Sequence, residues 1–268
     1  MAKTETVLLT VEGAVATLTL NRPAALNALD EPMIDALHAA LIAVERDDAI
    51  RCLVLRGAGD SFMAGGDVKT FLRTVGALPP DERQATFELT IGRVHASIES
   101  LRRMAKPVVA AVQGACAGFG VSLMLAADLV LAADDAVFTL AYCHIGTSPD
   151  GGSTYHLPRA VGLKRAMEIA LLGDRFGAQE AARIGLINRA VPAADLAAET
   201  ARLAGRLARG PTAAYGRTKR LLGSALDRDL AAQLSAECAE FVASTLTEDF
   251  REGVTAFVEK RPPVFRGR

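Results

Sequence analysis

The sequence predicts an α/β protein in which short apolar strands alternate with helices, followed by a helical C-terminal region. Over the first 140 residues, β-branched runs recur between amphipathic stretches, which is typical of a wound α/β core. Half of the 268 residues are hydrophobic, enough for one large core. After Leu157, helical spacing of the apolar residues dominates.

The elements of the first half follow from local patterns. Two β-branched runs flank Glu12-Gly13, which indicates a hairpin. Asp30 precedes apolar residues at helical spacing and is expected to cap a helix. The polar segment 78–83 is expected to be a loop. The expected strands cover 7–11, 15–20, 52–55, 108–112, 128–132 and 136–140, and the further helices cover 68–75, 85–104 and 121–127.

The second half predicts helices over 162–172 and 178–184, a strand over 186–191, and then helices from residue 194 onward. Pro211 and Gly223 are expected to interrupt the last helices. The sequence therefore predicts a core over residues 1–195 and a helical region over residues 196–268.

Composition and charge exclude several classes of protein. A net charge of −1 provides no basic field for nucleic acid. Residues 107–127 carry no charge, but Gln113, a proline and three glycines favour a buried strand, loop and helix over a membrane span. The N-terminus lacks the pattern of a signal peptide, and four scattered cysteines suit reduced thiols. We expect a cytoplasmic protein that binds neither nucleic acid nor membranes.

Several catalytic motifs are incomplete. Gly118-Phe119-Gly120 lacks the third glycine of a dinucleotide fingerprint, and Met124 replaces the second glycine of a nucleophile elbow around Ser122. The four histidines show no metal-ligand spacing, so no metal site is expected. His95 is expected to be structural.

Two glycine-rich stretches each follow a strand and precede a helix, FMAGGD at 62–67 and GACAGFG at 114–120. Both place main-chain N–H groups at a helix N-terminus, where the helix dipole favours negative charge. If the two loops converge, they can form an oxyanion hole for an enolate or a tetrahedral intermediate.

Segments along nearly the whole chain resemble the enoyl-CoA hydratase/isomerase family, also called the crotonase family. The matching segments are NRPAALNAL (21–29), SFMAGGDVK (61–69), residues 106–129, residues 157–191 and FVEKRPPVF (257–265). The resemblance implies a spiral of ββα units, a C-terminal helical region that mediates a homotrimer or a dimer of trimers, and an acyl-CoA thioester as substrate. Coenzyme A is then part of the substrate, and no separate cofactor is expected.

The resemblance also implies site residues. It assigns the oxyanion hole to the main-chain N–H groups of Ala64 and Phe119, the second of which stands where the family usually has glycine. The residues that it implies for acyl-CoA binding are Ala25, Leu26, Ala28, Ala64, Gly66, Asp67, Val68, Gly118, Phe119 and Tyr142.

Two positions depart from the hydratases of this family. Those enzymes activate a water with two glutamates, and the corresponding residues here are Ser122 and Tyr142. The chain keeps the frame that activates a thioester but lacks the pair that activates water. Efficient hydration by that mechanism is therefore not expected.

Asp150 is the candidate acid/base. Pro149-Asp150-Gly151 has the composition of a tight turn, so the carboxylate could serve only the turn. Members that resemble this chain here are isomerases that shift a double bond from the 3,4 to the 2,3 position. One carboxylate suffices, because it removes a proton from C2 and returns it to C4. We expect conversion of 3-enoyl-CoA to 2-trans-enoyl-CoA with Asp150 as acid/base.

Other interpretations stay open. In an aryl-CoA dehalogenase, an aspartate at this position attacks the ring as nucleophile, with a histidine in the place of His95. Isomerases that open an epoxyphenylacetyl-CoA-like ring use the same single aspartate. A hydratase with weak or altered activity and a noncatalytic acyl-CoA-binding relative are the remaining alternatives.

Overall fold

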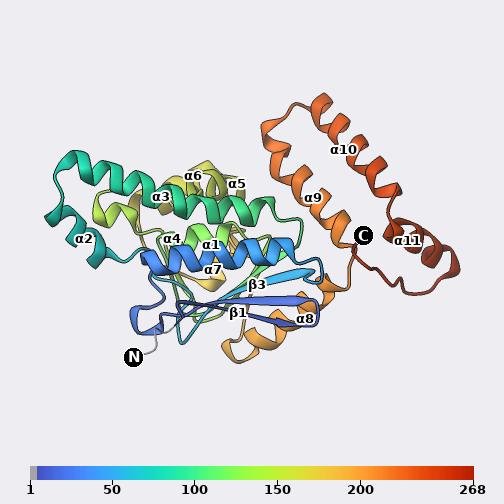
Figure 1. Cartoon of the computed structure of the whole chain (residues 1–268), viewed down its shortest axis with the longest axis horizontal. Helices are drawn as coiled ribbons and strands as arrows, with labels where there is room; N and C mark the ends of the chain where they lie inside the picture. The colour runs from blue at the N-terminus through green and yellow to red at the C-terminus, as the bar shows by residue number, and fades with distance from the viewer. Residues whose placement is uncertain (1–4) are drawn as a thin grey trace.

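A six-stranded sheet lies at the centre of the computed structural model, which describes residues 5–268 (Figure 1). Its order is β1-β2-β3-β4-β6-β9. The first two strands form the predicted antiparallel hairpin, and all other neighbours are parallel. The strands are β1 (Val7–Glu12), β2 (Val15–Leu20), β3 (Cys52–Gly57), β4 (Val108–Val112), β6 (Leu129–Ala133) and β9 (Arg189–Val191).

A second sheet has three strands in the order β5-β7-β8. They are β5 (Ala115–Ala117), β7 (Val137–Thr139) and β8 (Phe176–Gly177). From β4 to β7, successive strands alternate between the sheets, since β4 and β6 join the first sheet while β5 and β7 join the second. Helix α4 (Phe119–Leu125) follows β5, so the chain winds as the expected spiral of ββα units.

Helix α1 (Glu31–Arg46) shows how the sequence specifies a helix of the core. The Asp30 carboxylate accepts a hydrogen bond from the Met33 N–H at 3.0 Å, which is the predicted cap. The buried face of the helix carries the residues at helical spacing, and the helix packs along α3 (Pro80–Arg103). Helix α2 (Val68–Ala77) lies beside them (Figure 1).

Some predicted boundaries were wrong. The segment expected to be a loop at 78–83 contains the start of α3, because Pro80 fits the first turn of a helix and Asp81 and Glu82 are stabilised by its dipole. Residues for which no element was predicted form α5 (Ser153–Val161), and the strand predicted over 186–191 is confined to β9. Helices α6 (Leu163–Leu172) and α7 (Ala178–Arg183) match their predictions closely.

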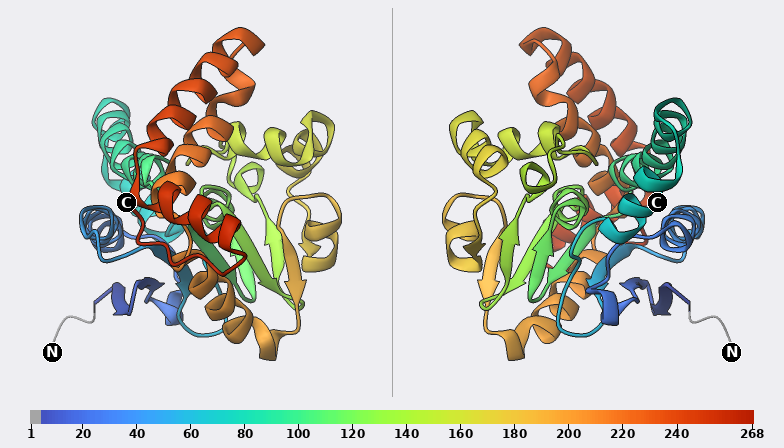
Figure 2. Two further views of the ribbon diagram at one scale, coloured as in Figure 1. Left: turned by 90° about the vertical axis from the view of Figure 1, so that its right-hand side faces the viewer. Right: turned by 90° about the vertical axis from the view of Figure 1, so that its left-hand side faces the viewer.

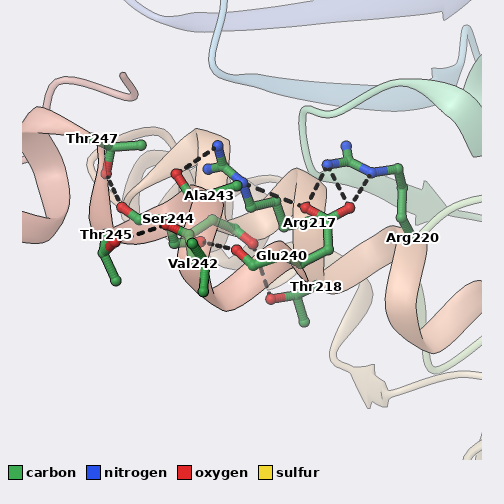
Figure 3. Close-up of polar contacts among 10 residues, drawn as sticks. Arg217, Thr218, Arg220, Glu240, Val242, Ala243, Ser244, Thr245 and Thr247 are labelled. Atoms are coloured by element: carbon green, nitrogen blue, oxygen red, sulfur yellow. Dashed lines mark hydrogen bonds and ion pairs between the residues drawn. The ribbon is translucent and has the colours of Figure 1, made fainter. Parts of the chain in front are cut away.

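The C-terminal helices differ in their contact with the core. Helix α8 (Leu196–Ala208) packs on the central sheet, with Ala204 and Ala208 buried against Val54. The C-terminal arm, which we define as α9 (Thr212–Ser224), α10 (Leu230–Thr245) and α11 (Glu248–Glu259), extends away from the core (Figures 1 and 2). Helices α9 and α10 are joined by ion pairs of Glu240 (Figure 3).

The uncharged segment 107–127 lies inside the protein, as the sequence predicts. It forms β4, β5 and α4, and most of its side chains are buried in the main core. Within residues 5–268, no helix is long and apolar enough to cross a membrane.

Candidate active site

The two glycine-rich loops lie side by side. The Met63 N–H donates to the Ala115 carbonyl at 3.0 Å, and the Ala117 N–H donates to the Met63 carbonyl at 2.8 Å. A Cβ atom added to Gly65 would lie 3.4 Å from the Phe119 nitrogen, so only a residue without a side chain allows this approach comfortably. The convergence that the sequence predicts is therefore present.

Hydrogen bonding decides which N–H groups of these loops can face a substrate. The Ala64 N–H donates to the Leu26 carbonyl at 2.9 Å, so the prediction of Ala64 as an oxyanion donor is wrong. The N–H of Gly66 makes no hydrogen bond within residues 5–268. Phe119 begins α4, and its N–H likewise has no acceptor in the described part of the chain. Gly66 and Phe119 thus each offer a free main-chain donor, one from each loop.

The side chain of Phe119 links the oxyanion loop to the turn around Asp150. Phe119 is almost fully buried. A Cβ atom on Gly151 would lie 2.7 Å from the Phe119 ring and 2.8 Å from the Ser122 Cβ. The ring therefore packs directly against the turn, while the Phe119 main chain stays free to donate.

Four elements hold the Asp150 turn. The Asp150 carbonyl accepts from the Ser122 hydroxyl on α4 at 2.8 Å and from the Ser153 hydroxyl on α5 at 3.0 Å. The Gly151 N–H donates to His95 Nε2 on α3 at 3.3 Å. The carboxylate itself accepts from the Tyr142 hydroxyl, which comes from a single 3-10 turn, η2 (Tyr142–Ile145).

The two positions that carry glutamates in hydratases meet at Asp150, Ser122 at its main-chain carbonyl and Tyr142 at its carboxylate. The Ser122 hydroxyl lies 3.4 Å from the Tyr142 hydroxyl, and both contact Asp150. Burial first, and then the charge of Asp150, raise the pKa of Tyr142 far above its usual value, so the phenol stays protonated and donates. The site contains one carboxylate with two hydroxyls beside it.

The predicted acyl-CoA residues fall into two groups. Ala25, Leu26 and Ala28 lie beside the loop of Gly66, because the Leu29 N–H donates to the Gly65 carbonyl at 2.8 Å and the Asp67 N–H to the Leu29 carbonyl at 3.0 Å. Val68 begins α2 directly after this loop and is about half exposed. Gly118, Phe119 and Tyr142 belong to the side of the Asp150 turn.

Sequence reasoning missed two residues that shape the first group. Arg22 forms ion pairs with Asp30 at 3.1 Å and with Asp67 at 3.3 Å. Asn27 is fully buried, and its amide donates to three main-chain carbonyls, those of Ala58, Ser61 and Phe62. Both stand in the NRPAALNAL segment. A polar residue among small apolar ones was the sequence feature that could have marked them as site residues.

Comparison with known proteins gives a family match over most of the chain. The family described as "Enoyl-CoA hydratase/isomerase" matches residues 10–268. The chain belongs to this family. It is 42% identical to a probable enoyl-CoA hydratase of Rhodobacter capsulatus over 96% of each chain. It is 40% identical to the 1,2-epoxyphenylacetyl-CoA isomerase of Escherichia coli, over 98% of this chain and 99% of that protein.

Solved structures of the family have the same fold. An enoyl-CoA hydratase from Polaromonas sp. JS666 has a TM-score of 0.90 at 37% identity, over 97% of this chain and 99% of that one. A putative enoyl-CoA hydratase/isomerase from Mycobacterium abscessus has a TM-score of 0.92 at 35% identity, over 98% and 100%. As a member of this family, the protein is an enzyme that acts on acyl-CoA. Relatives bear hydratase and isomerase names alike, so the choice of reaction depends on the residues of the site.

Proposed function

We propose that this enoyl-CoA hydratase/isomerase family member converts 3-enoyl-CoA to 2-trans-enoyl-CoA, with Asp150 as the acid/base. The observation that carries the proposal is the packing of the Asp150 turn on Phe119, the residue whose N–H opens α4. The Asp150 carboxylate, as proton acceptor, and the Phe119 N–H, as oxyanion donor, are thereby held in place relative to one another by buried contacts.

The reaction then uses the groups already described. The thioester oxygen accepts hydrogen bonds from the N–H groups of Gly66 and Phe119, which stabilise the charge that develops on it. Asp150 removes a proton from C2, and the electron pair of that C–H bond enters the dienolate. The dienolate then collapses as Asp150 returns the proton to C4, which leaves the double bond between C2 and C3. The reaction needs no metal and no cofactor besides the coenzyme A of the substrate.

The same site is poorly suited to hydration. A hydratase needs carboxylates to hold and deprotonate a water, whereas Ser122 and Tyr142 offer hydroxyls that stay protonated near neutral pH. The two hydroxyl oxygens lie 3.4 Å apart, so a water molecule does not fit directly between them.

The decisive experiment compares wild type with Asp150→Asn. Isomerisation is followed by the rising absorbance of the conjugated thioester, and acyl-CoA binding by calorimetry. We expect Asp150→Asn to lose about 10³-fold or more in kcat, since general acid–base catalysis contributes 10²–10⁴-fold, while acyl-CoA still binds. Full isomerase activity in Asp150→Asn, or fast hydration of crotonyl-CoA by the wild type, would contradict the proposal. Binding without turnover across acyl-CoA substrates would favour a noncatalytic relative.

A second candidate substrate has a ring. The 40% identity to a 1,2-epoxyphenylacetyl-CoA isomerase favours it, and one carboxylate beside an oxyanion hole suits both reactions. The two substrates are separated by their kcat/KM values on the same preparation. Release of halide from an aryl-CoA would instead indicate that Asp150 acts as a nucleophile, in the environment of His95.

We also propose that copies of this chain associate through the C-terminal arm as a trimer or a dimer of trimers. Helix α10 contains no buried residue, and its large apolar side chains are exposed. Examples are Leu230, Leu234 and Phe241, the first of which is 73% exposed. Light scattering coupled to size exclusion is expected to give an oligomer that Leu234→Glu with Phe241→Glu dissociates. A wild-type monomer would contradict this proposal.

For the cellular location, we propose the cytoplasm. All four cysteines are free thiols, and two of them, Cys52 and Cys116, are buried. Burial raises the pKa of Cys52 to about 12, which keeps that thiol protonated and unreactive. Localisation of a tagged full-length chain tests the proposal, and export from the cell would contradict it.

A further inference from the structure

Tyr142 contacts the Asp150 carboxylate differently from the other residues of the turn. Its hydroxyl donates to Asp150 Oδ1. Ser122 and Ser153 donate to the Asp150 main-chain carbonyl, and His95 accepts from the Gly151 N–H. In the described chain, Tyr142 is therefore the residue that hydrogen-bonds the Asp150 carboxylate, while the other three contact the main chain of the turn.

The backbone around Tyr142 is held in an unusual conformation. Ala141, immediately before it, has φ of +56°, in the left-handed region that a residue with a Cβ atom rarely adopts. Gly146, at the other end of η2, has φ of +70°. Strained residues of this kind persist only where the surrounding structure enforces them, and they cluster at functional sites. The turn aims the phenol at Asp150.

The phenol is the donor in its hydrogen bond with the Asp150 carboxylate. Its burial and the neighbouring charge of Asp150 raise the pKa of Tyr142, so it does not ionise at physiological pH. The neighbouring Ser122 hydroxyl has its own acceptor in the Asp150 carbonyl at 2.8 Å. One oxygen of the carboxylate is therefore continuously occupied by a neutral donor.

We propose that Tyr142 is a positioning residue that occupies Oδ1 of Asp150 and leaves Oδ2 as the single proton carrier of the reaction. This inference rests on the proposed function of Asp150. With Oδ1 held, the carboxyl group cannot rotate, and the proton taken from C2 stays on the oxygen that faces the substrate until it reaches C4. Without the phenol, the carboxyl group can turn, and its proton can exchange with water before delivery.

The test uses 3-enoyl-CoA deuterated at C2 and Tyr142→Phe. In the wild type, a measurable share of product carries deuterium at C4, detected by mass spectrometry and NMR. In Tyr142→Phe, we expect this share to fall, kcat to fall about 10- to 100-fold and KM to change by less than about 2-fold, since the variant loses a hydrogen bond to a charged group but keeps the aromatic ring. A thermal melt verifies that the variant is folded.

Two further variants distinguish a specific effect on the Asp150 carboxylate from a general disturbance of the turn. Ser153→Ala removes a hydroxyl that supports the same turn, and we expect it to lower kcat less and to keep the wild-type deuterium share. Incorporation of 3,5-difluorotyrosine at position 142 keeps ring and donor and must also keep that share. A share that falls equally in all three variants overturns the proposal.

The remaining outcomes are equally informative. A wild type that transfers no deuterium to C4 overturns the proposal, because the carboxyl proton then exchanges faster than it is delivered. Wild-type kcat and deuterium share in Tyr142→Phe overturn it as well. If Asp150→Asn is inactive in that case, the proposed function stands and only the role of Tyr142 fails. If Asp150→Asn stays active, the proposed function itself fails.

Discussion

The Asp150 turn and the C-terminal arm carry polar groups in opposite environments. At the turn, Ser122 and Ser153 are fully buried, and both donate to the Asp150 carbonyl. On the arm, the Glu240 carboxylate pairs with the half-exposed Arg220 at 3.0 Å and with the more buried Arg217 at 3.5 Å, and about a quarter of the Glu240 side chain stays exposed to solvent (Figure 3).

The difference shows where geometry is fixed. A buried hydroxyl that loses its acceptor cannot turn to water, so every contact at the turn constrains the others. An exposed ion pair exchanges partners with water and salt at little cost. The core therefore determines the position of Asp150, whereas the arm leaves large apolar side chains of α10 exposed. Substitutions in each region should show effects that differ accordingly.

The largest effect is expected at Gly151. Gly151→Ala combines φ of +62° with a Cβ atom 2.7 Å from the Phe119 ring, so the turn must move. We expect a loss of about 3 kcal/mol in the free energy of unfolding and isomerase activity lowered at least as much as by Tyr142→Phe. Urea unfolding and turnover measure the two effects.

Gly146→Ala is the matched control. Gly146 also has positive φ, at +70°, but a Cβ atom there meets no atom within 4 Å. It is expected to cost only about 1 kcal/mol, the cost of the left-handed conformation. Equal losses in both variants would mean that packing on Phe119 is unimportant for the turn.

The next largest effect is expected where the C-terminal arm meets the core. Lys219 on α9 pairs with Asp128 at 2.7 Å and donates to the Lys106 carbonyl at 3.0 Å, and both charged groups are largely buried. Lys219→Met removes the nearest cation from the Asp128 carboxylate, which keeps the Val108 N–H at 2.8 Å and the more distant Arg102 at 3.9 Å. We expect a loss of about 2 kcal/mol in unfolding free energy. Adding Asp128→Asn should restore part of it. A double variant no more stable than Lys219→Met contradicts this explanation.

Local patterns predicted much of the fold but less of the site. The strands of the central sheet and the cap at Asp30 follow from short-range rules. Helix α5 was missed because Pro158 and the hydroxyl residues at its start are unfavourable inside helices. Asp150 was found as a turn residue, and its catalytic role stays a prediction from the resemblance.

The remaining site features depend on contacts between distant segments. The Ala64 N–H is engaged because a carbonyl nearly forty residues earlier in the chain, that of Leu26, reaches it. The bond from Tyr142 to Asp150 requires the positive φ of Ala141, which no propensity predicts for alanine. Packing from several elements decides both features, so sequence periodicity contains no sign of them.

A smaller effect is expected in the pH dependence of stability. Burial, followed by the charges of Arg102 and Arg159, lowers the pKa of His156 to about 4 from an ordinary value of 6.5. The unfolded chain therefore binds a proton at His156 more readily than the folded chain does. The stability that the neutral His156 contributes is present above pH 6.5 and is lost as the pH falls through 4.

His156→Gln removes that contribution. Between pH 7 and pH 4, its unfolding free energy should fall by about 1 kcal/mol less than that of the wild type, a value already reduced for the solvent screening of a partly exposed ring. Chemical denaturation across this range measures the difference. Parallel pH curves for the two proteins would show that His156 is not responsible.

The smallest effect is expected on the C-terminal arm, at Glu240. Glu240→Gln removes its ion pairs with Arg217 and Arg220, and we expect a loss of about 0.5 kcal/mol that disappears in 1 M salt. The neighbouring helix offers a contrast, because Asp249 is buried and accepts from the Arg266 and Gly267 N–H groups. Asp249→Asn should cost about 2 kcal/mol and keep most of that cost in salt. If Glu240→Gln costs as much as Asp249→Asn, burial is not what separates strong from weak polar contacts in this protein.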